Sequence, residues 1–372
     1  MNYILPDGSG RPLYWQLYAC LRNDIVSGVY PHGHRLPSKR LLTEELHISP
    51  VTVEHAYALL CDEGYAEARE RSGCFVTFQP GNGFFTPAPA NPKPGTAPAG
   101  ETGLPAGGEE ADISCGFSAA QMARTMRRTL NESAEKLLSR TEPTGSPELR
   151  EALRTYLARS RGLSCTAEQI VIGAGAEYLY GQILRLLGTG RRYAIESPSY
   201  HMIEKSYRAA GVAYEQLPLG PQGIETGALA STLASVLHVT PYRSFPSFIT
   251  ASASKRYEYV RWASPEGRYL IEDDYESEFS VSGTPEETLY ALSPERHVIY
   301  MNTFSQTIAP SLRAAYMVLP ENLLPAYRDR LAYGGCPVPT FEQLFLTSVL
   351  QSGEFERHIN RVRRAKRRLS RP

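Results

Sequence analysis

The residues best suited to chemistry lie in a polar segment between two short apolar runs, 298–301 and 314–319. Both runs have the composition of strands. The segment between them is predicted to be a loop. Its hydroxyl and N–H donors could surround an anion while a guanidinium fork binds the anion's oxygens. A plain surface loop is the alternative interpretation. The polar groups belong to Asn302, Thr303, Ser305, Gln306, Thr307 and Arg313.

Small residues form a second candidate anion site, where a predicted strand at 169–172 passes into a helix that runs to Leu187. Small side chains let backbone N–H groups approach a phosphate, and the helix dipole favours negative charge there. A tight strand–helix turn is the alternative. The candidates are Gly175, Ala176 and Glu177. The carboxylate of Glu177 would repel a phosphate.

Four segments resemble fold-type I pyridoxal-phosphate (PLP) proteins, the aminotransferase fold. They are 140–150 (Y-x-x-P-x-G-x-x-x-L-R in the family), 196–200 (E-x-P-x-Y), 272–279 (E-D-D-Y-x-S-E-F) and 303–313 (T-F-S-K-x-x-x-P-x-x-R). The resemblance implies a phosphate site, a stacking tyrosine, a pyridine-nitrogen partner and a phenol near the ring hydroxyl. The phosphate site would contain Thr303 and Arg313, together with Gly175, Ala176 and Glu177, because the strand–turn–helix order at the last three resembles the family's phosphate-binding S-G-x-Q turn. Tyr200 would be the stacking tyrosine, Asp273 the pyridine-nitrogen partner and Tyr275 the phenol near the ring hydroxyl.

Gln306 occupies the position of the family's Schiff-base lysine. A carboxamide is not nucleophilic and cannot form a Schiff base with the cofactor aldehyde, so we expect no catalytic residue here. Residues 239–248 also depart from the family's T-P-x-x-Q-x-P-T-G run, which makes cofactor contacts in that segment doubtful.

The elements that must position these residues fall into two domains. Residues 79–111 are rich in Pro and Gly and predict a semi-extended linker, because they offer too little apolar surface to form a core. The linker separates a small domain at 1–78 from a large one at 112–372. Strands and helices alternate from about 165 to 320, which indicates an α/β domain with a mainly parallel sheet.

The small domain is predicted to contain three helices and a β-hairpin, a winged helix-turn-helix. Apolar residues recur at helical spacing after Pro12, and Gly28 ends the first helix. Ser38 and Ser49 are candidate N-caps of the second and third helices. The hairpin turn is expected at 70–73.

The whole small domain resembles GntR-type DNA-binding domains. Shared motifs include R-L-P-S-K-R at 35–40, A-Y-x-x-L-x-x-E-G-Y at 56–65 and S-G-x-F-V at 72–76. The resemblance implies that 49–60 enter the major groove, that Arg40 contacts phosphate and that Gly73 lies at the wing tip. The DNA-binding candidates are Arg35, Ser38, Lys39, Arg40, Ser49, Val51, Thr52, His55 and Gly73.

Charge opposes tight DNA binding by one copy of this domain. Residues 1–78 hold seven Lys and Arg against nine Asp and Glu. Because DNA affinity depends largely on phosphate neutralisation, binding should be weak unless the protein is a dimer.

Composition excludes several other classes of protein. The 372 residues are 42% hydrophobic and 21% charged, typical of a soluble globular protein. No apolar run approaches the roughly 20 residues that span a bilayer. Residues 1–8 lack the features of a signal peptide. The six cysteines form no C-x-x-C pair, so we expect no metal site and reduced thiols in the cytoplasm.

Winged helix, linker and aminotransferase-like domain together resemble the MocR subgroup of GntR regulators across nearly the whole chain. The resemblance implies a homodimeric transcription regulator with a double-stranded DNA operator and an amino acid or amine effector. PLP, where bound, would be held non-covalently. A PLP-dependent aminotransferase of class I/II and a cofactor-free dimerisation or binding protein remain as alternatives.

The basic segment at 357–372 resembles the helix that enters the family's C-terminal subdomain. That subdomain continues for several dozen residues and supplies the arginine that binds a substrate carboxylate. No equivalent is present in this sequence, so we expect this subdomain to be incomplete. A solvated helix face is the expected role of the basic residues, with DNA contact as the alternative.

Overall fold

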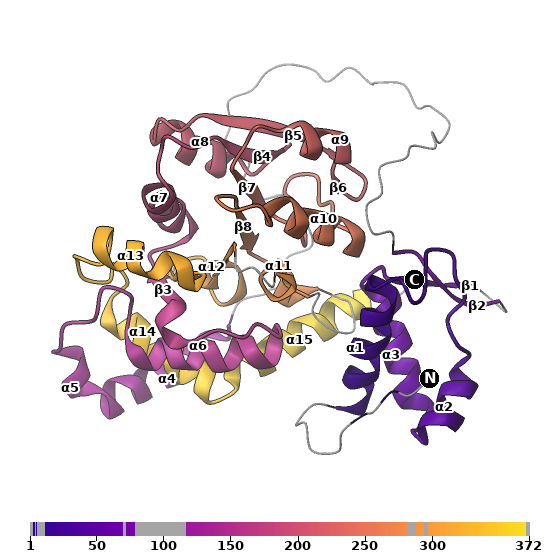
Figure 1. Ribbon diagram of the computed structural model, residues 1–372. Helices are drawn as coiled ribbons and strands as arrows, with labels where there is room; N and C mark the ends of the chain where they lie inside the picture. Colours follow the sequence, from indigo (N-terminus) through magenta and orange to yellow (C-terminus); the bar gives the residue numbers. More distant parts are fainter. Residues whose placement is uncertain are drawn as a thin grey trace.

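The computed structural model describes residues 3, 5, 12–69, 72–78, 117–280, 287–293 and 297–369 (Figure 1). The predicted linker at 79–111 lies outside the described residues, as do residues 70 and 71 of the predicted hairpin turn. Within the described ranges, no helix is long and apolar enough to cross a membrane.

The N-terminal unit has the predicted order of three helices and a two-stranded hairpin. The second and third helices begin where Ser38 and Ser49 cap them, and each serine oxygen accepts a backbone N–H at 3.1 Å. Both predicted N-caps are therefore confirmed. The elements are α1 (Leu13–Val26), α2 (Lys39–Leu46), α3 (Pro50–Asp62), β1 (Ala66–Arg69) and β2 (Gly73–Val76).

The second unit is an α/β domain around an eight-stranded sheet, as the sequence predicts. The strands are β3 (Ile170–Gly173), β4 (Tyr193–Ser197), β5 (Tyr214–Gly220), β6 (Gly223–Ile224), β7 (Val236–Val239), β8 (Tyr269–Asp274), β9 (Val298–Thr303) and β10 (Ala315–Val318). The helices are α4 (Ala119–Glu132), α5 (Ala134–Leu137), α6 (Pro147–Ser160), α7 (Ala176–Leu187), α8 (His201–Ala209), α9 (Thr226–Ser231), α10 (Ala253–Ala263), α11 (Leu289–Leu292), α12 (Phe304–Thr307), α13 (Leu324–Arg330), α14 (Thr340–Gln351) and α15 (Glu354–Leu369).

The strand order is β3-β10-β9-β8-β7-β4-β5-β6, and the central strands pair in parallel. A mainly parallel sheet is therefore confirmed. β10 runs antiparallel to both of its neighbours. Residues 304–314, which join β9 to β10, are too few for the crossover that parallel strands require, so the chain turns straight back.

The prediction of a polar loop between β9 and β10 is partly wrong. Asn302 and Thr303 extend β9, and residues 304–307 form the short helix α12. Two buried interactions hold this turn. The Phe304 N–H donates to the Ala314 carbonyl at 2.9 Å, and the imidazole Nε2 of His358 on α15 lies 2.9 Å from the Thr307 carbonyl.

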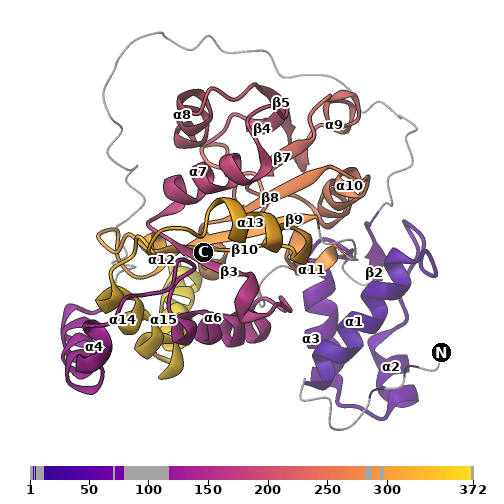
Figure 2. The ribbon, with the colours of Figure 1, turned by 60° about the vertical axis from the view of Figure 1, so that its left-hand side comes forward.

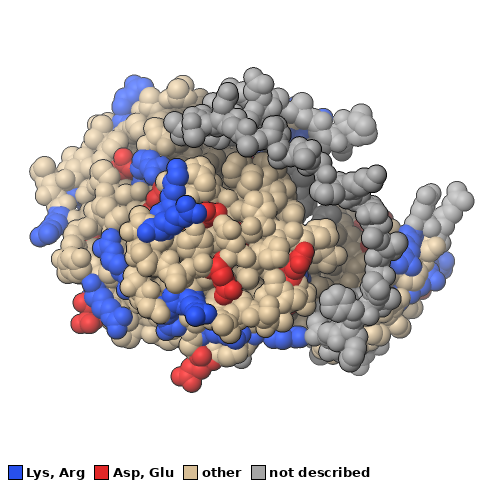
Figure 3. Space-filling view, turned by 90° about the horizontal axis from the view of Figure 1, so that it is seen from above, with Lys and Arg blue, Asp and Glu red and all other residues tan. Residues whose placement is uncertain are grey.

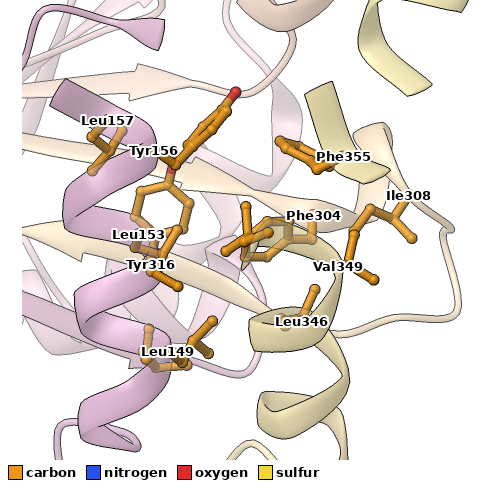
Figure 4. Close-up of a cluster of buried hydrophobic side chains, with 14 of the residues drawn as sticks. Leu149, Leu153, Tyr156, Leu157, Phe304, Ile308, Tyr316, Leu346, Val349 and Phe355 are labelled. Carbon is orange, nitrogen blue, oxygen red and sulfur yellow. The ribbon is translucent and has the colours of Figure 1, made fainter. Parts of the chain in front are cut away.

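Helices cover both faces of the sheet (Figure 1). Alternate residues of β10 enter different cores: Tyr316 packs with side chains of α6, α14 and α15, whereas Met317 packs with α7, α8 and α13. Figure 4 shows the first core, in which the Phe304 ring lies near Tyr316 and Phe355. The turn that carries Gln306 is thus anchored by the aromatic side chain two residues before it.

The N-terminal unit contacts the large domain at α10 and just before α11, and Figure 2 shows its helices beside α11. Ala253 belongs to the N-terminal core, and the Tyr257 ring lies 5.3 Å from Phe78. Two ion pairs join the units, Arg22 with Glu287 and Arg256 with Glu63.

We expect Phe355→Ala to lower the free energy of unfolding by about 3–5 kcal/mol, because it leaves a cavity in a closed core. Phe355 is 1% exposed, and its ring lies 5.1 Å from Tyr156. Urea denaturation followed by circular dichroism measures the change. Leu138→Ala, at a side chain that is 91% exposed, is the control and should change it by less than about 0.5 kcal/mol. Similar losses in both variants would contradict this core.

Candidate functional site

One cavity of about 290 Å³ lies beyond the carboxyl ends of β8 and β9. It brings together all but one of the predicted cofactor residues, and Gln306 with them. The exception is Gly175, which precedes the lining residue Ala176. The lining consists of Ala176, Glu177, Tyr180, Tyr200, Thr240, Phe245, Asp273, Tyr275, Thr303, Ser305, Gln306 and Arg313.

Three lining residues were missed by the sequence analysis: Tyr180, Thr240 and Phe245. Tyr180 lies four residues after Ala176 on α7, and that spacing places both on one helix face. Thr240 and Phe245 come from the segment in which cofactor contacts seemed doubtful, and the structure places both at the cavity.

Asp273 forms the acidic floor of the cavity and is 4% exposed. Its Oδ2 accepts from the Tyr180 hydroxyl at 2.5 Å and lies 3.5 Å from Nε2 of His238. Burial and the nearby carboxylate raise the pKa of Tyr180 well above its usual value, which keeps the phenol protonated as a donor. These contacts fix the carboxylate of Asp273 in one orientation.

A buried ionic network lies behind Asp273. Arg161 pairs with Asp274 at 2.7 Å, and the Tyr300 hydroxyl donates to the same carboxylate at 2.8 Å. The Asn302 amide donates to Glu278 at 2.8 Å. Burial, with a smaller effect of the Asp274 charge, raises the pKa of Glu278 to about 7.

Glu177 and Arg313 form an ion pair of 2.8 Å at the predicted phosphate corner. The approach depends on Gly175, which has φ +94° at the start of α7. A Cβ atom there would lie 2.9 Å from Nη2 of Arg313. The corner therefore holds a carboxylate beside the arginine that the family uses for phosphate.

The hydroxyl groups around the turn bond to the protein's own backbone. Ser305 donates to the Leu312 carbonyl at 2.9 Å, and Thr303 Oγ1 accepts from the Ser305 N–H at 3.2 Å. The Tyr275 hydroxyl donates to the Arg243 carbonyl at 2.6 Å. Gln306 is exposed at the edge of the cavity.

A groove of about 470 Å³ in the N-terminal unit gathers four of the predicted DNA-binding residues, Arg35, Ser38, Lys39 and Gly73. Gly73 has φ +111°, and a Cβ atom there would lie 2.9 Å from Nε of Arg35. The wing glycine thus lets this arginine lie against the hairpin. Arg69, which the sequence analysis did not select, also lines the groove.

The remaining DNA-binding candidates lie outside that groove lining. Val51 and His55 are exposed on α3, and the His55 ring lies 5.7 Å from Tyr14. The Ser49 hydroxyl, besides capping α3, lies 2.8 Å from the Thr52 hydroxyl. Arg40 is an exposed residue of α2.

Three basic residues at this surface pair with acids. Arg40 meets Glu44 at 2.8 Å, Lys39 meets Glu54 at 3.4 Å, and Arg69 meets Glu67 at 2.6 Å. These pairs partly neutralise the charges that would meet phosphate. In the view from above, Lys and Arg side chains lie at several places on the visible face (Figure 3).

Two family models match the chain. The model of bacterial regulatory proteins, gntR family, matches residues 13–76, and that of aminotransferase class I and II matches residues 114–238. These matches fall on the two structural units.

Three curated relatives align along almost the whole chain. YdeL of Bacillus subtilis, an uncharacterized HTH-type transcriptional regulator, is 31% identical, and the alignment covers 96% of this chain and 77% of YdeL. The pyridoxine biosynthesis transcriptional regulator PdxR of Corynebacterium glutamicum is 30% identical, with 94% and 75% covered. The probable rhizopine catabolism regulatory protein MocR of Rhizobium meliloti is 28% identical, with 97% and 76% covered.

Solved aminotransferases share the fold of the large domain. A kynurenine aminotransferase of Pyrococcus horikoshii matches with a TM-score of 0.61 and 25% identity over 67% of this chain. A multiple substrate aminotransferase of Thermococcus profundus matches with a TM-score of 0.60 and 20% identity, also over 67%. The chain spans about 64% of the length of each.

PLP binding is implied by this fold for the family, but the cavity suits only part of the cofactor. The ring end fits, because a buried carboxylate and the aromatic side chains of Tyr200 and Tyr275 are present. The aldehyde end lacks an amine at Gln306, and the phosphate end already contains Glu177. The residues therefore do not fit a cofactor held by both a covalent bond and its phosphate.

We predict a pH-dependent gain in relative stability for Glu278→Gln. The pKa of Glu278 is about 7 when folded, against 4.5 ordinarily, so its stabilising effect is complete below pH 4.5 and is lost as the pH rises through about 7. Glutamine does not titrate. Between pH 4.5 and 7.5 the variant should gain roughly 3 kcal/mol of unfolding free energy relative to the unsubstituted protein.

Urea denaturation of both proteins at a series of pH values measures this difference. Buried Glu272, whose pKa is also raised to about 7, is present in both and cancels. A difference that stays constant across the pH range would contradict the assigned titration. Glu151→Gln, at an exposed position of α6, is the control and should show no such gain.

Proposed function

Because the chain belongs to the MocR subgroup of GntR-type transcription regulators, we propose that it regulates transcription by binding operator DNA and sensing a small ligand. The winged helix-turn-helix binds the DNA. The aminotransferase-like domain binds the ligand and catalyses no transamination.

One observation carries the non-catalytic part of this proposal. The cavity keeps the acid Asp273 and the arginine Arg313, but a carboxamide, that of Gln306, stands at the position of the reactive amine. Transamination needs a primary amine both for covalent attachment and for proton transfer. A cavity with the binding groups and without the amine can recognise a ligand but not transform it.

The groove between α2, α3 and the wing supports DNA binding. Its charged lining residues are Arg35, Lys39, Arg69 and Glu54, so it is locally basic although the domain as a whole is acidic. A locally basic groove can follow a phosphate backbone. We propose that the protein is a homodimer, because one acidic domain makes few phosphate contacts and two copies double their number. We place it in the cytoplasm.

An amino acid or amine is the proposed effector, and PLP entering the cavity would be held without a covalent bond. A short route leads from the cavity to the DNA-binding unit. Thr240 and Phe245 line the cavity, and the chain continues from them into α10. The first residue of α10, Ala253, packs in the core of the DNA-binding unit. A ligand that shifts this segment therefore acts on the position of that unit.

DNA binding is tested with the fragment upstream of the protein's own gene, by fluorescence anisotropy at several salt concentrations. Arg40→Ala removes one phosphate contact, so affinity should fall several-fold and the slope of log K against log salt should decrease by about 1. Glu54→Gln frees Lys39 and should change affinity in the opposite direction.

Glu132→Gln, an exposed acid on α4, is the matched control and should bind as the unsubstituted protein does. Absence of binding at low salt, or identical salt slopes for all variants, would overturn the DNA-binding proposal.

The absence of catalysis at Gln306 is tested by restoring the amine. In Gln306→Lys, pyridoxal, which has the aldehyde but no phosphate, should leave a mass adduct on residue 306 after borohydride, at a concentration about ten-fold lower than a surface lysine needs, because the cavity positions the aldehyde. Peptide mass spectrometry locates the adduct. Gln351→Lys, at an exposed glutamine outside the cavity, supplies the comparison.

Equal labelling of the two introduced lysines would argue that the cavity does not position the aldehyde. Turnover of an amino donor and a keto acid by the unsubstituted protein would favour the aminotransferase alternative.

A further inference from the structure

We propose that Glu177 makes this cavity selective for an unphosphorylated ligand with an aromatic ring and a protonated nitrogen. The inference deepens the proposed ligand-sensing function and rests on it. Glu177 determines whether a phosphorylated or an unphosphorylated ligand binds better in the cavity.

The phosphate corner already contains an acidic side chain of the protein. Glu177 lies in the first turn of α7, where the helix dipole favours an anion. Its Oε2 lies 2.8 Å from Nη2 of Arg313. The protein's own carboxylate thus pairs with the guanidinium that would otherwise bind a phosphate, and it adds a negative charge beside the helix terminus.

The cavity lining has a net negative charge. Its charged lining residues are Glu177, Asp273 and Arg313, which sum to minus one. A phosphate monoester adds nearly two further negative charges beside Glu177. A protonated nitrogen has the opposite effect, because it neutralises the excess acid.

The second acid of the cavity has one carboxylate oxygen without a contact to the described residues. Asp273 is buried, and the recorded contacts from Tyr180 and His238 both reach the same oxygen, Oδ2. Within the described part of the chain, Oδ1 is therefore the oxygen left to meet a ligand. Tyr200 and Phe245, whose ring centroids lie 6.1 Å apart, supply aromatic surface to the same cavity. This end suits a flat nitrogen base.

The test uses pyridoxine and pyridoxine 5'-phosphate, which differ only in the phosphate. Neither has an aldehyde, so neither can react with lysines. Isothermal titration of the full chain, without DNA, gives both dissociation constants. For the unsubstituted protein, we expect pyridoxine to bind at least as tightly as its phosphate.

In Glu177→Gln, the ratio of the two dissociation constants should move by at least about ten-fold in favour of the phosphate ester. Inorganic phosphate should then compete with the ester. Glu151→Gln removes an acid from another Glu–Arg pair, on α6, and should leave the ratio unchanged. Circular dichroism melting of each variant checks that it is folded.

Tighter binding of the phosphate ester by the unsubstituted protein would overturn the proposal, as would binding of neither compound. A parallel gain for both compounds in Glu177→Gln would also overturn it. None of these results bears on DNA binding, so failure of this inference is distinguishable from failure of the regulatory function.

Discussion

Two adjacent buried acids at the end of β8 are the constraint on which the aminotransferase-like domain depends. Successive residues of a strand point to opposite faces, so Asp273 and Asp274 leave β8 in different directions. Asp274 meets Arg161, a fully buried ion pair, and Asp273 faces the cavity. A buried carboxylate without a partner would destabilise the fold by several kcal/mol. Because Arg161 neutralises Asp274, the strand can end in two acids, and the second acid, Asp273, is left to line the cavity.

Much of the fold could be predicted, because local chemistry determines it. Serine before an amphipathic run begins a helix, which places the starts of α2 and α3. Alternating strands and helices predict a mainly parallel sheet. The direction of β10 could not be inferred from its apolar composition, since the length of the preceding turn decides it. The same turn hides a short helix that polar composition presents as a loop.

The cavity was predictable only where a motif spans consecutive residues. Resemblance selected Asp273, Tyr200 and Arg313, which the fold gathers at one cavity. Tyr180 and Phe245 enter from elements whose local sequence carries no such signal. The pairing of Glu177 with Arg313 joins residues 136 positions apart, and only the sheet brings them together. The pairing of Lys39 with Glu54 likewise depends on tertiary structure, since it forms only where α2 packs against α3.

The residues that hold this fold together differ from the residue that would carry out the family's chemistry. Asp273 is held by Tyr180, and Phe304 anchors the turn before Gln306. Both interactions contribute to folding whether or not a reaction occurs. The lysine amine makes no such contribution, since a side chain exposed at the cavity edge can change at little cost in stability. A chain that needs only to recognise a ligand can therefore lose the amine and keep the cavity. What remains is a shaped, acidic site one segment away from the helix that contacts the DNA-binding unit.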